Sequence, residues 1–275
     1  MSSFGLIGDP LSHSLSPALY GELFRQFRLQ DSFDKFIVKP EELEAFVKEN
    51  TFLGFNITIP HKETIIPFLG LLSPEARIMG AVNCVKKTPA GFVGHNTDWL
   101  GFKTALNINK VDAAGKKCLI IGAGGAAKAI IYALINTGAG YIRILNRHYD
   151  RALLLAAWAQ KLSKNGAEAV CLEDINFREI NIIINCTPQG MWPAVNAIPL
   201  NPNHINSELT LIDTVYNPLE TKWLQAGREK GALTLGGLDM FIHQALASLK
   251  IWNPGFNFKK IDLDQVKKAL IWELR

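Results

Sequence analysis

The sequence Gly122-Ala123-Gly124-Gly125-Ala126-Ala127 has small residues at a spacing that suits dinucleotide binding. It fits the pattern G-x-G-x-x-A, follows the apolar run Lys117–Ile121 and opens a helical stretch. The first glycine permits a tight turn, the second lets a pyrophosphate approach the backbone, and the small third residue keeps helix and strand close. The N–H groups of the helix N-terminus favour phosphate. Packing alone would also explain a glycine-rich turn, but the order of strand, turn and helix favours a dinucleotide site.

The residues after the next predicted strand indicate which dinucleotide binds. NAD sites carry an acidic residue there, about 20 residues after the glycines, whereas this chain has Asn146 and Arg147. Arg147 and Arg151 could bind a 2′-phosphate through planar, charge-assisted donors, which favours NADP. Asp150 is expected to cap the following helix. Arg151 could also be a solvated helix residue, and His148 beside Arg147 leaves the strictness of the cofactor preference open.

Polar residues near the N-terminus indicate a site for a small polar ligand. Ser14 and Ser16 precede a helical pattern, with Ser16 suited to the N-cap and Pro17 to the first helical position. Two hydroxyls at a helix N-terminus could bind a carboxylate, although plain capping would also explain Ser16. Asn56 and Thr58 end an apolar strand, and alternation directs both side chains to one side. Ligands bind beyond the carboxyl ends of parallel strands, so this position suits a binding site.

Short apolar runs alternate with amphipathic stretches along the chain, which predicts βαβ units and the α/β fold class. Strands are expected at Phe4–Ile7, Phe33–Val38, Phe52–Ile57, Val82–Lys86, Phe92–His95, Lys117–Ile121, Tyr141–Leu145, Asn181–Asn185 and Leu209–Asp213. The length of 275 residues favours two domains. We expect a mostly parallel α/β domain from residues 1–100 plus 240–275, and a Rossmann-type, doubly wound dinucleotide-binding domain from 101–239. The cleft between them is the expected site.

The composition excludes several other classes of protein. The formal net charge is +4, and the basic residues are scattered rather than gathered into a stripe, so no nucleic acid partner is expected. No apolar run approaches the ~20 residues that span a bilayer, and no signal core follows Met1, so we expect a cytoplasmic protein without membrane contact. The four cysteines lack C-x-x-C spacing, and no metal is expected. A homodimer is compatible with the sequence, which does not indicate the oligomeric state.

Taken together and in order, the motifs resemble the shikimate dehydrogenase family along nearly the whole chain. The matching pieces are Ser14-x-Ser16-Pro17, Asn56-x-Thr58-x-Pro60-x-Lys62, Gly80-Ala81-Val82-Asn83, Asn96-Thr97-Asp98-x-x-Gly101, the glycine turn through Lys128, Asn146-Arg147, Gln189-Gly190-Met191, Asp213-x-Val215-Tyr216-x-Pro218, and Gly237 through Gln244-Ala245. The chain departs from the family pattern at Cys84, Pro188 and His148. Only His148 bears on function, because an imidazole replaces a hydroxyl near the expected 2′-phosphate.

The resemblance implies a reversible, NADPH-dependent reduction of 3-dehydroshikimate to shikimate, a step in the synthesis of chorismate and the aromatic amino acids. It implies that the substrate-binding residues are Ser14 and Ser16 on the carboxylate, with Thr58, Lys62, Asn83, Asp98, Tyr216 and Gln244 around the ring. The implied NADP-binding residues are Gly122, Gly124, Gly125, Ala126, Ala127, Asn146, Arg147 and Arg151, with Met191, Val215 and Gly237 near the nicotinamide. Lys62 and Asp98 match the catalytic pair of the family.

The chemistry assigns a role to this pair. Hydride transfer to a ketone builds negative charge on the carbonyl oxygen, which needs a proton donor. We expect Lys62 to donate the proton and Asp98 to orient the Lys62 ammonium, both facing the nicotinamide across a groove.

Three alternative functions remain open. The first is a quinate/shikimate dehydrogenase that uses NAD or both cofactors. The second is a ligand sensor without chemistry, which would not need both Lys62 and Asp98. The third is an S-adenosylmethionine methyltransferase, in which an acidic residue would be expected in place of Asn146-Arg147.

Overall fold

The computed structural model describes residues 3–11 and 14–274. The chain forms two compact units. Unit 1 contains the residues up to Thr97 and those from Gln244 onward, and unit 2 is Asp98–His243. The chain therefore passes between the units twice, once at residues 97–98 and once inside helix α9 (Leu238–Trp252).

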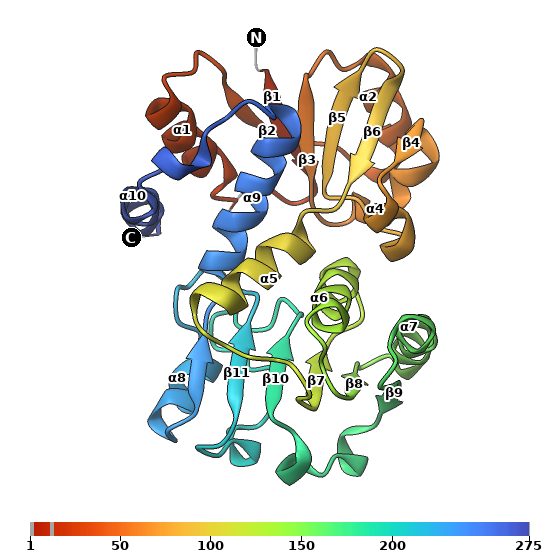
Figure 1. Ribbon diagram of the computed structural model, residues 1–275, viewed down its shortest axis with the longest axis vertical. Coiled ribbons are helices and arrows are strands. Elements are labelled where there is room, and N and C mark those ends of the chain that lie inside the picture. The colour runs from red at the N-terminus through yellow and green to blue at the C-terminus, as the bar shows by residue number, and fades with distance from the viewer. Residues whose placement is uncertain (1–2, 12–13, 275) are drawn as a thin grey trace. The chain divides into compact units, whose positions relative to one another are not determined.

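Unit 1 is built on a six-stranded sheet with the strand order β2-β1-β3-β5-β6-β4 (Figure 1). Its strands are β1 (Phe4–Gly8), β2 (Phe33–Ile37), β3 (Gly54–Ile57), β4 (Leu71–Leu72), β5 (Cys84–Thr88) and β6 (Gly91–His95). Its helices are α1 (Ser16–Phe27), α2 (Leu43–Glu49), α3 (His61–Thr64), α4 (Pro74–Met79), the second part of α9, and α10 (Leu263–Glu273). Short 3₁₀ turns lie at Pro40–Glu42, Ile66–Phe68 and Phe258–Lys260.

The sheet of unit 1 is mixed. Strand β1 pairs in parallel with β2 and β3, and β4 pairs in parallel with β6, whereas β5 is antiparallel to both β3 and β6. Strand β1 is buried along its whole length, as its apolar sequence predicts for a central strand. Helix α9 packs closely on the sheet where Gly54 leaves room for the indole of Trp252, and Trp252 Nε1 donates to Val85 O at 2.9 Å.

Unit 2 is an all-parallel, six-stranded sheet with the order β12-β11-β10-β7-β8-β9. Its strands are β7 (Cys118–Ile121), β8 (Ile142–Leu145), β9 (Ala167–Val170), β10 (Ile182–Asn185), β11 (Thr210–Asp213) and β12 (Leu233–Leu235). Its helices are α5 (Asp98–Ile108), α6 (Gly125–Asn136), α7 (Tyr149–Leu162), α8 (Lys222–Glu229) and the first part of α9. Short 3₁₀ turns lie at Leu172–Asp174, Phe177–Glu179 and Pro202–His204.

Counted from β7 as the first strand, this order reads 3-2-1-4-5-6, the doubly wound arrangement of dinucleotide-binding folds. The direction of the strand order reverses between β7 and β10, and ligands bind at the carboxyl ends of the strands at such a point. The residues of β7 are buried on both faces, as its continuous apolar run predicts. The predicted α/β class and the Rossmann-type unit are thus confirmed.

The sequence patterns missed three short strands, β4, β9 and β12, each of two to four residues. Within the part of the chain that the structure describes, no helix combines the length and the apolar character needed to cross a membrane.

Candidate functional site

The glycine turn lies where the two halves of unit 2 meet. Gly122 has φ +111°, and its N–H donates to Leu145 O at 2.8 Å. A Cβ on Gly122 would come within 3.0 Å of Thr187 Cγ2, in the loop after β10. A Cβ on Gly124, at the N-cap of α6, would meet no atom of the described residues within 4 Å. The turn is therefore crowded on its protein side and open on the other, which fits the approach of a pyrophosphate to the backbone.

The two alanines that end the motif differ in burial. Ala127 is fully buried in the core between β7 and α6, as the third small residue of the pattern requires. Ala126, on the first turn of α6, is partly exposed.

The tip of β8 carries the residues predicted to select NADP. The side chains of Arg147 and Arg151 are exposed, and Asn146 Nδ2 donates to His148 O at 2.8 Å. The prediction that Asp150 caps the helix was wrong, because α7 begins at Tyr149 with His148 at its N-cap. Asp150 lies in the first turn instead. Two exposed guanidinium groups without an acid at the strand tip fit a 2′-phosphate.

A buried polar cluster, here called the unit 2 network, joins the ends of β10 and β11. Its members are Asn185, Thr187, Asp213 and Thr221. Asn185 Nδ2 donates to Asp213 Oδ1 at 2.9 Å, and Thr221 Oγ1 donates to Asp213 Oδ2 at 2.9 Å. Asn185 Oδ1 accepts from the Thr187 hydroxyl at 2.6 Å. Burial raises the pKa of Asp213 to about 6, although its three hydrogen bonds oppose this shift.

Backbone bonds bring together the loops predicted to lie near the nicotinamide. Gly237 N donates to Val215 O at 3.0 Å. Trp192 N, directly after Met191, donates to Asn217 O at 3.0 Å. These bonds connect the loops that follow β10, β11 and β12.

Tyr216 stacks on Phe241 of α9, with ring centroids 4.3 Å apart. Burial raises the pKa of Tyr216 to about 12, so its hydroxyl stays protonated at neutral pH.

In unit 1, polar residues gather where β3 ends. Thr58 N donates to Ile7 O at 2.9 Å, which places Thr58 beside the end of β1. Gly8 makes this approach possible, because a Cβ there would lie 2.5 Å from Thr58 Cγ2. Lys62 follows on α3, and its carbonyl accepts from Val82 N at 2.7 Å.

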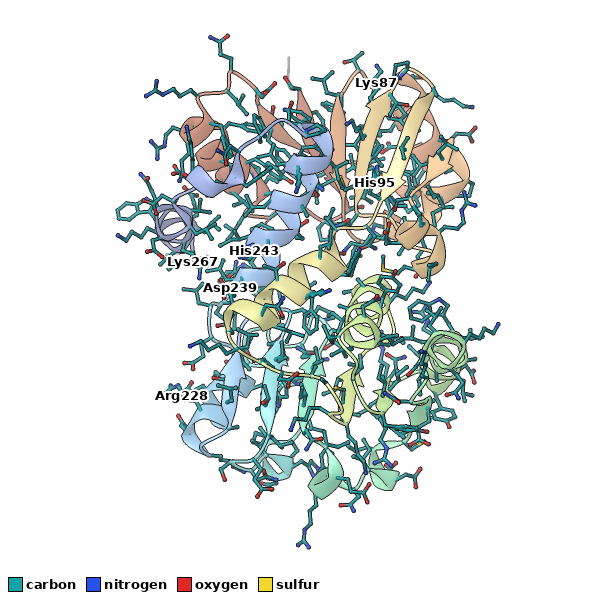
Figure 2. All side chains as sticks on the ribbon, viewed as in Figure 1. Lys87, His95, Arg228, Asp239, His243 and Lys267 are labelled. Atoms are coloured by element: carbon teal, nitrogen blue, oxygen red, sulfur yellow. The ribbon has the colours of Figure 1, made fainter. Side chains whose placement is uncertain are left out.

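Asn83 connects several of the predicted residues. Its Oδ1 accepts from Thr97 N at 2.6 Å, and its Nδ2 donates to Gln244 Oε1 at 3.3 Å. Its backbone N–H donates to the carbonyl of His95 at 3.0 Å. His95 is the last residue of β6 (Figure 2). Asp98 follows Thr97 directly as the buried first residue of α5. The backbone of Lys62 is thus hydrogen-bonded to Val82, and Asp98 follows the residue whose backbone is hydrogen-bonded to Asn83.

Behind Asn83 lies a second buried cluster, the unit 1 network, formed by Tyr20, Asn56, Asn83, Thr97 and Ser248. Tyr20 donates to Asn56 Oδ1 at 2.7 Å. Asn56 Nδ2 donates to both Asn83 O and Ser248 Oγ at 3.0 Å. The hydroxyls of Ser248 and Thr97 are 3.0 Å apart.

The sequence reasoning missed Tyr20 and Ser248. The sequence signal for each was a hydroxyl residue on the apolar, buried face of a helix. Tyr20 lies among Leu19 and Leu23 in α1, and Ser248 lies among Ala245 and Leu249 in α9.

Ser14 and Ser16 lie together, with Ser14 Oγ donating to Ser16 Oγ at 3.2 Å. The prediction that Ser16 caps the helix was wrong. Helix α1 has Leu15 at its N-cap, because Leu19 N bonds to Leu15 O at 3.0 Å. The Ser16 hydroxyl therefore has no capping bond, and capping no longer explains it.

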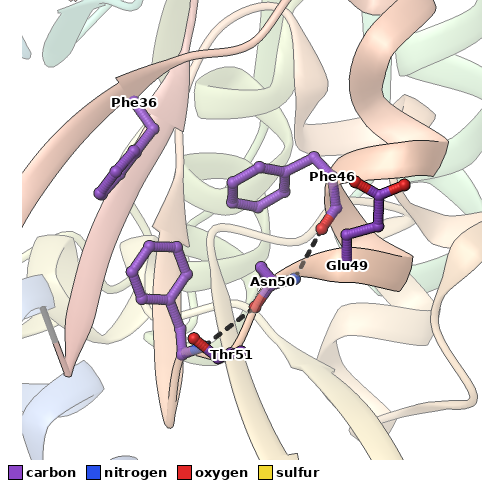
Figure 3. A pocket seen from close by; sticks show the side chains of 6 residues that line it. Phe36, Phe46, Glu49, Asn50 and Thr51 are labelled. Atoms are coloured by element: carbon purple, nitrogen blue, oxygen red, sulfur yellow. Dashed lines mark hydrogen bonds between the residues drawn. The ribbon is translucent and has the colours of Figure 1, made fainter. Parts of the chain in front are cut away.

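Unit 1 also has an open pocket of about 290 Å³ between β2, α2 and the segment before β3. Three phenylalanine rings and the side chains of Glu49, Asn50 and Thr51 surround it (Figure 3). Asn50 is bonded to Phe46 O and to Phe52 N, so its amide serves the local backbone. None of the predicted site residues lines this pocket.

The fold and these residues define a two-unit α/β protein whose second unit is a dinucleotide-binding domain of the dehydrogenase type. Comparison with known proteins agrees. Residues 6–85 match the family model for the shikimate dehydrogenase substrate binding domain, and residues 103–195 match the model for shikimate / quinate 5-dehydrogenase.

Two curated relatives are named shikimate dehydrogenase (NADP(+)). The protein from Caldanaerobacter subterraneus is 36% identical over 268 residues, which is 96% of each chain. The protein from Carboxydothermus hydrogenoformans is 39% identical over 254 residues, which is 90% of each chain. The crystal structure of shikimate 5-dehydrogenase from Thermus thermophilus in complex with NADP(H) and shikimate has a TM-score of 0.86 at 31% identity, covering 99% of this chain and 100% of that one. The chain belongs to the shikimate dehydrogenase family, which confirms the resemblance seen in its motifs.

Proposed function

We propose that this protein catalyses the reversible reduction of 3-dehydroshikimate to shikimate with NADPH, in the cytoplasm, as a step toward chorismate and the aromatic amino acids. Residues 1–100 plus 240–275 would bind the substrate, and residues 101–239 would bind NADP. The observation that carries the proposal is the position of Asn83. Its side chain bonds to the Gln244 side chain and to the backbone of Thr97, which precedes Asp98. The residue before it, Val82, donates its backbone N–H to the carbonyl of Lys62.

The residues of unit 2 fit NADP. The open side of Gly124 would receive the pyrophosphate, and the exposed guanidinium groups of Arg147 and Arg151 would bind the 2′-phosphate. The loops that carry Met191, Val215 and Gly237 would hold the nicotinamide. When bound, the cofactor supplies the hydride for the substrate carbonyl carbon.

Side chains of unit 1, together with Asp98 and Tyr216 of unit 2, supply the proton and hold the ring. The Lys62 ammonium donates a proton to the carbonyl oxygen as negative charge develops on it, which gives the product hydroxyl. Asp98 accepts a hydrogen bond from the Lys62 ammonium and orients it. The neighbouring hydroxyls of Ser14 and Ser16 donate to the substrate carboxylate, while Thr58, Asn83, Tyr216 and Gln244 bind the ring hydroxyls.

Nicotinamide absorbance tests the proposal directly. Purified protein is assayed with shikimate or quinate, each paired with NADP or NAD. Turnover with shikimate and NADP is expected. The family model that matches unit 2 includes quinate in its description, and this supports the alternative of a quinate/shikimate dehydrogenase. Turnover only with quinate and NAD would reverse both assignments.

Replacement of Lys62 tests the catalytic assignment. Lys62→Ala should lower kcat by roughly 10²–10⁴-fold and change the KM for shikimate far less, because proton donation acts mainly on the transition state. Lys48→Ala is the matched control, since Lys48 is an exposed lysine whose ammonium pairs with Glu44. A Lys62→Ala enzyme with wild-type turnover would end this assignment.

A further inference from the structure

Asp213 is a fully buried carboxylate at the end of β11. Its Oδ1 accepts from Asn185 Nδ2 at 2.9 Å and from Val215 N at 3.0 Å, and its Oδ2 accepts from Thr221 Oγ1 at 2.9 Å. All three partners are neutral donors. Among residues 3–11 and 14–274, no cationic side chain forms an ion pair with it. A buried anion held only by neutral donors disfavours folding, so the local packing does not account for the charge.

The hydrogen bonds around Asp213 do not require the charge either. The donors from Asn185 and Val215 are N–H groups, which can only donate. The third partner is the Thr221 hydroxyl, which can accept as well as donate. An asparagine with its Oδ1 toward the two N–H groups and its Nδ2 toward Thr221 would keep all three contacts. Neither packing nor hydrogen bonding therefore requires a charged residue at position 213, and we look for its reason in ligand binding.

Asp213 lies in the half of the fold that receives the nicotinamide. A doubly wound fold binds one mononucleotide over each half of its sheet, and the glycine turn after β7 fixes the pyrophosphate between them. The second half is β10–β12, and Asp213 ends its middle strand. The carboxylate also holds the amide of Val215, whose carbonyl accepts from Gly237 N.

Resting on the proposed function, we propose that the buried charge of Asp213 makes the protein prefer oxidised NADP, whose nicotinamide ring is cationic, over the reduced form, whose ring is neutral. The phosphates, riboses and adenine are the same in both forms and cancel from the comparison. The charge on the ring is the difference to which a nearby carboxylate responds, and the protein interior screens that attraction less than water does.

The test is the affinity of NADP⁺ and of NADPH for the wild type and for Asp213→Asn, measured by isothermal titration calorimetry without shikimate. The substitution should weaken NADP⁺ binding by about fivefold to tenfold and leave NADPH binding within about twofold. Thr221→Val, compared with the wild type at pH 8, is the matched control. It removes the hydroxyl that donates to Asp213 and accepts from Leu224 N at the start of α8, and it leaves the carboxylate in place. It should change the affinities of both nucleotides alike.

The outcomes separate this inference from the proposed function. If Asp213→Asn changes both affinities equally, or if Thr221→Val changes their ratio as much as Asp213→Asn does, the inference is overturned. A wild type that binds neither nucleotide would instead refute the proposed function.

The wild type also gives an arm that needs no substitution. Acidification from pH 8 to pH 5 should lower the ratio of NADP⁺ to NADPH affinity, because Asp213, with a pKa raised to about 6, becomes protonated. The titratable group that interacts with Asp213 among the described residues is the Cys186 thiol. Burial and the Asp213 charge raise the pKa of that thiol, so it stays neutral throughout. A ratio that does not change with pH would contradict the inference.

Discussion

The buried charge of Asp213 should make folding stability depend on pH in a direction opposite to that of most carboxylates. Burial raises the pKa of the folded Asp213 to about 6 from an ordinary value of 3.8. Between these pH values the folded state binds more protons than the unfolded state, so stability falls as the pH rises. The contribution is fully present below about pH 4 and is lost as the pH rises through about 6.

The magnitude follows from the shift. A difference of about two pKa units corresponds to about 3 kcal/mol of unfolding free energy, at 1.36 kcal/mol per unit. Asp213 is fully buried, so solvent screening does not reduce this figure much. When the pH is lowered from 7.5 to 4.5, the unfolding free energy of the wild type should rise by about 2 kcal/mol from this group. Asp213→Asn has no ionisable group at this position and should show no such rise in its unfolding free energy.

Urea unfolding of the wild type and of Asp213→Asn at pH 7.5, 6.0 and 4.5 gives the measurement. The difference between the two proteins is the informative quantity, because the titration of all other groups cancels from it. At pH 7.5 the unfolding free energy of the variant should be at least that of the wild type. On acidification the wild type should gain stability relative to the variant. A difference that is constant with pH, or that shifts toward the variant in acid, would refute the reasoning.

Four further substitutions test other parts of the structure. Ser248→Ala breaks the unit 1 network and should raise the KM for shikimate by about threefold to tenfold while the KM for NADP stays within twofold, as steady-state kinetics would show; an unchanged KM for shikimate would make the hydroxyl purely structural. Gly8→Ala should lower the unfolding free energy by about 1–3 kcal/mol, because its Cβ would lie 2.5 Å from Thr58 Cγ2. Gly21→Ala, in open space inside α1, should instead add about 0.5–1 kcal/mol, and equal effects in the two denaturation curves would speak against the packing argument. Arg151→Ala should raise the KM for NADP about tenfold and leave the KM for NAD within twofold, and parallel changes in both constants would exclude a 2′-phosphate contact.

The fold could be predicted from the sequence where the signal is local. The apolar run of β7, the glycine turn and the start of α6 follow one another within twenty residues, so the nucleotide-binding unit was recognisable. Strand direction was not encoded in this way. The runs that form β5 and β6 were predicted, but the turn between Thr88 and Gly91 makes them an antiparallel hairpin in a sheet expected to be mostly parallel. Strands β4 and β12 are too short for alternation to be visible.

For the site too, residues set by local sequence could be predicted and residues set by contacts distant in the chain could not. Gly122 and Gly124 could be predicted because the tight turn dictates their residue type. The role of Ser248 could not be predicted, because it bonds to Asn56, 192 positions away in the chain. Ser16 shows the opposite difficulty: a serine before proline at a helix start is also the pattern of an N-cap, and only the bond from Leu19 N to Leu15 O shows that it is not one.

The two buried networks differ in charge, and the difference matches their proposed ligands. The unit 1 network consists of hydroxyls and amides, and burial raises the pKa of Tyr20 so that it too stays neutral. A neutral network is what an anionic substrate requires, since a buried carboxylate behind the substrate site would repel the carboxylate of shikimate. The buried Asp98 is consistent with this pattern, because the proposed pairing with the Lys62 ammonium balances its charge. Asp213 lies in the unit that would bind the cofactor, where a negative charge would face a ring that is cationic in one redox state. On these proposals, the buried charge of Asp213 follows the charge of the cofactor rather than the demands of folding.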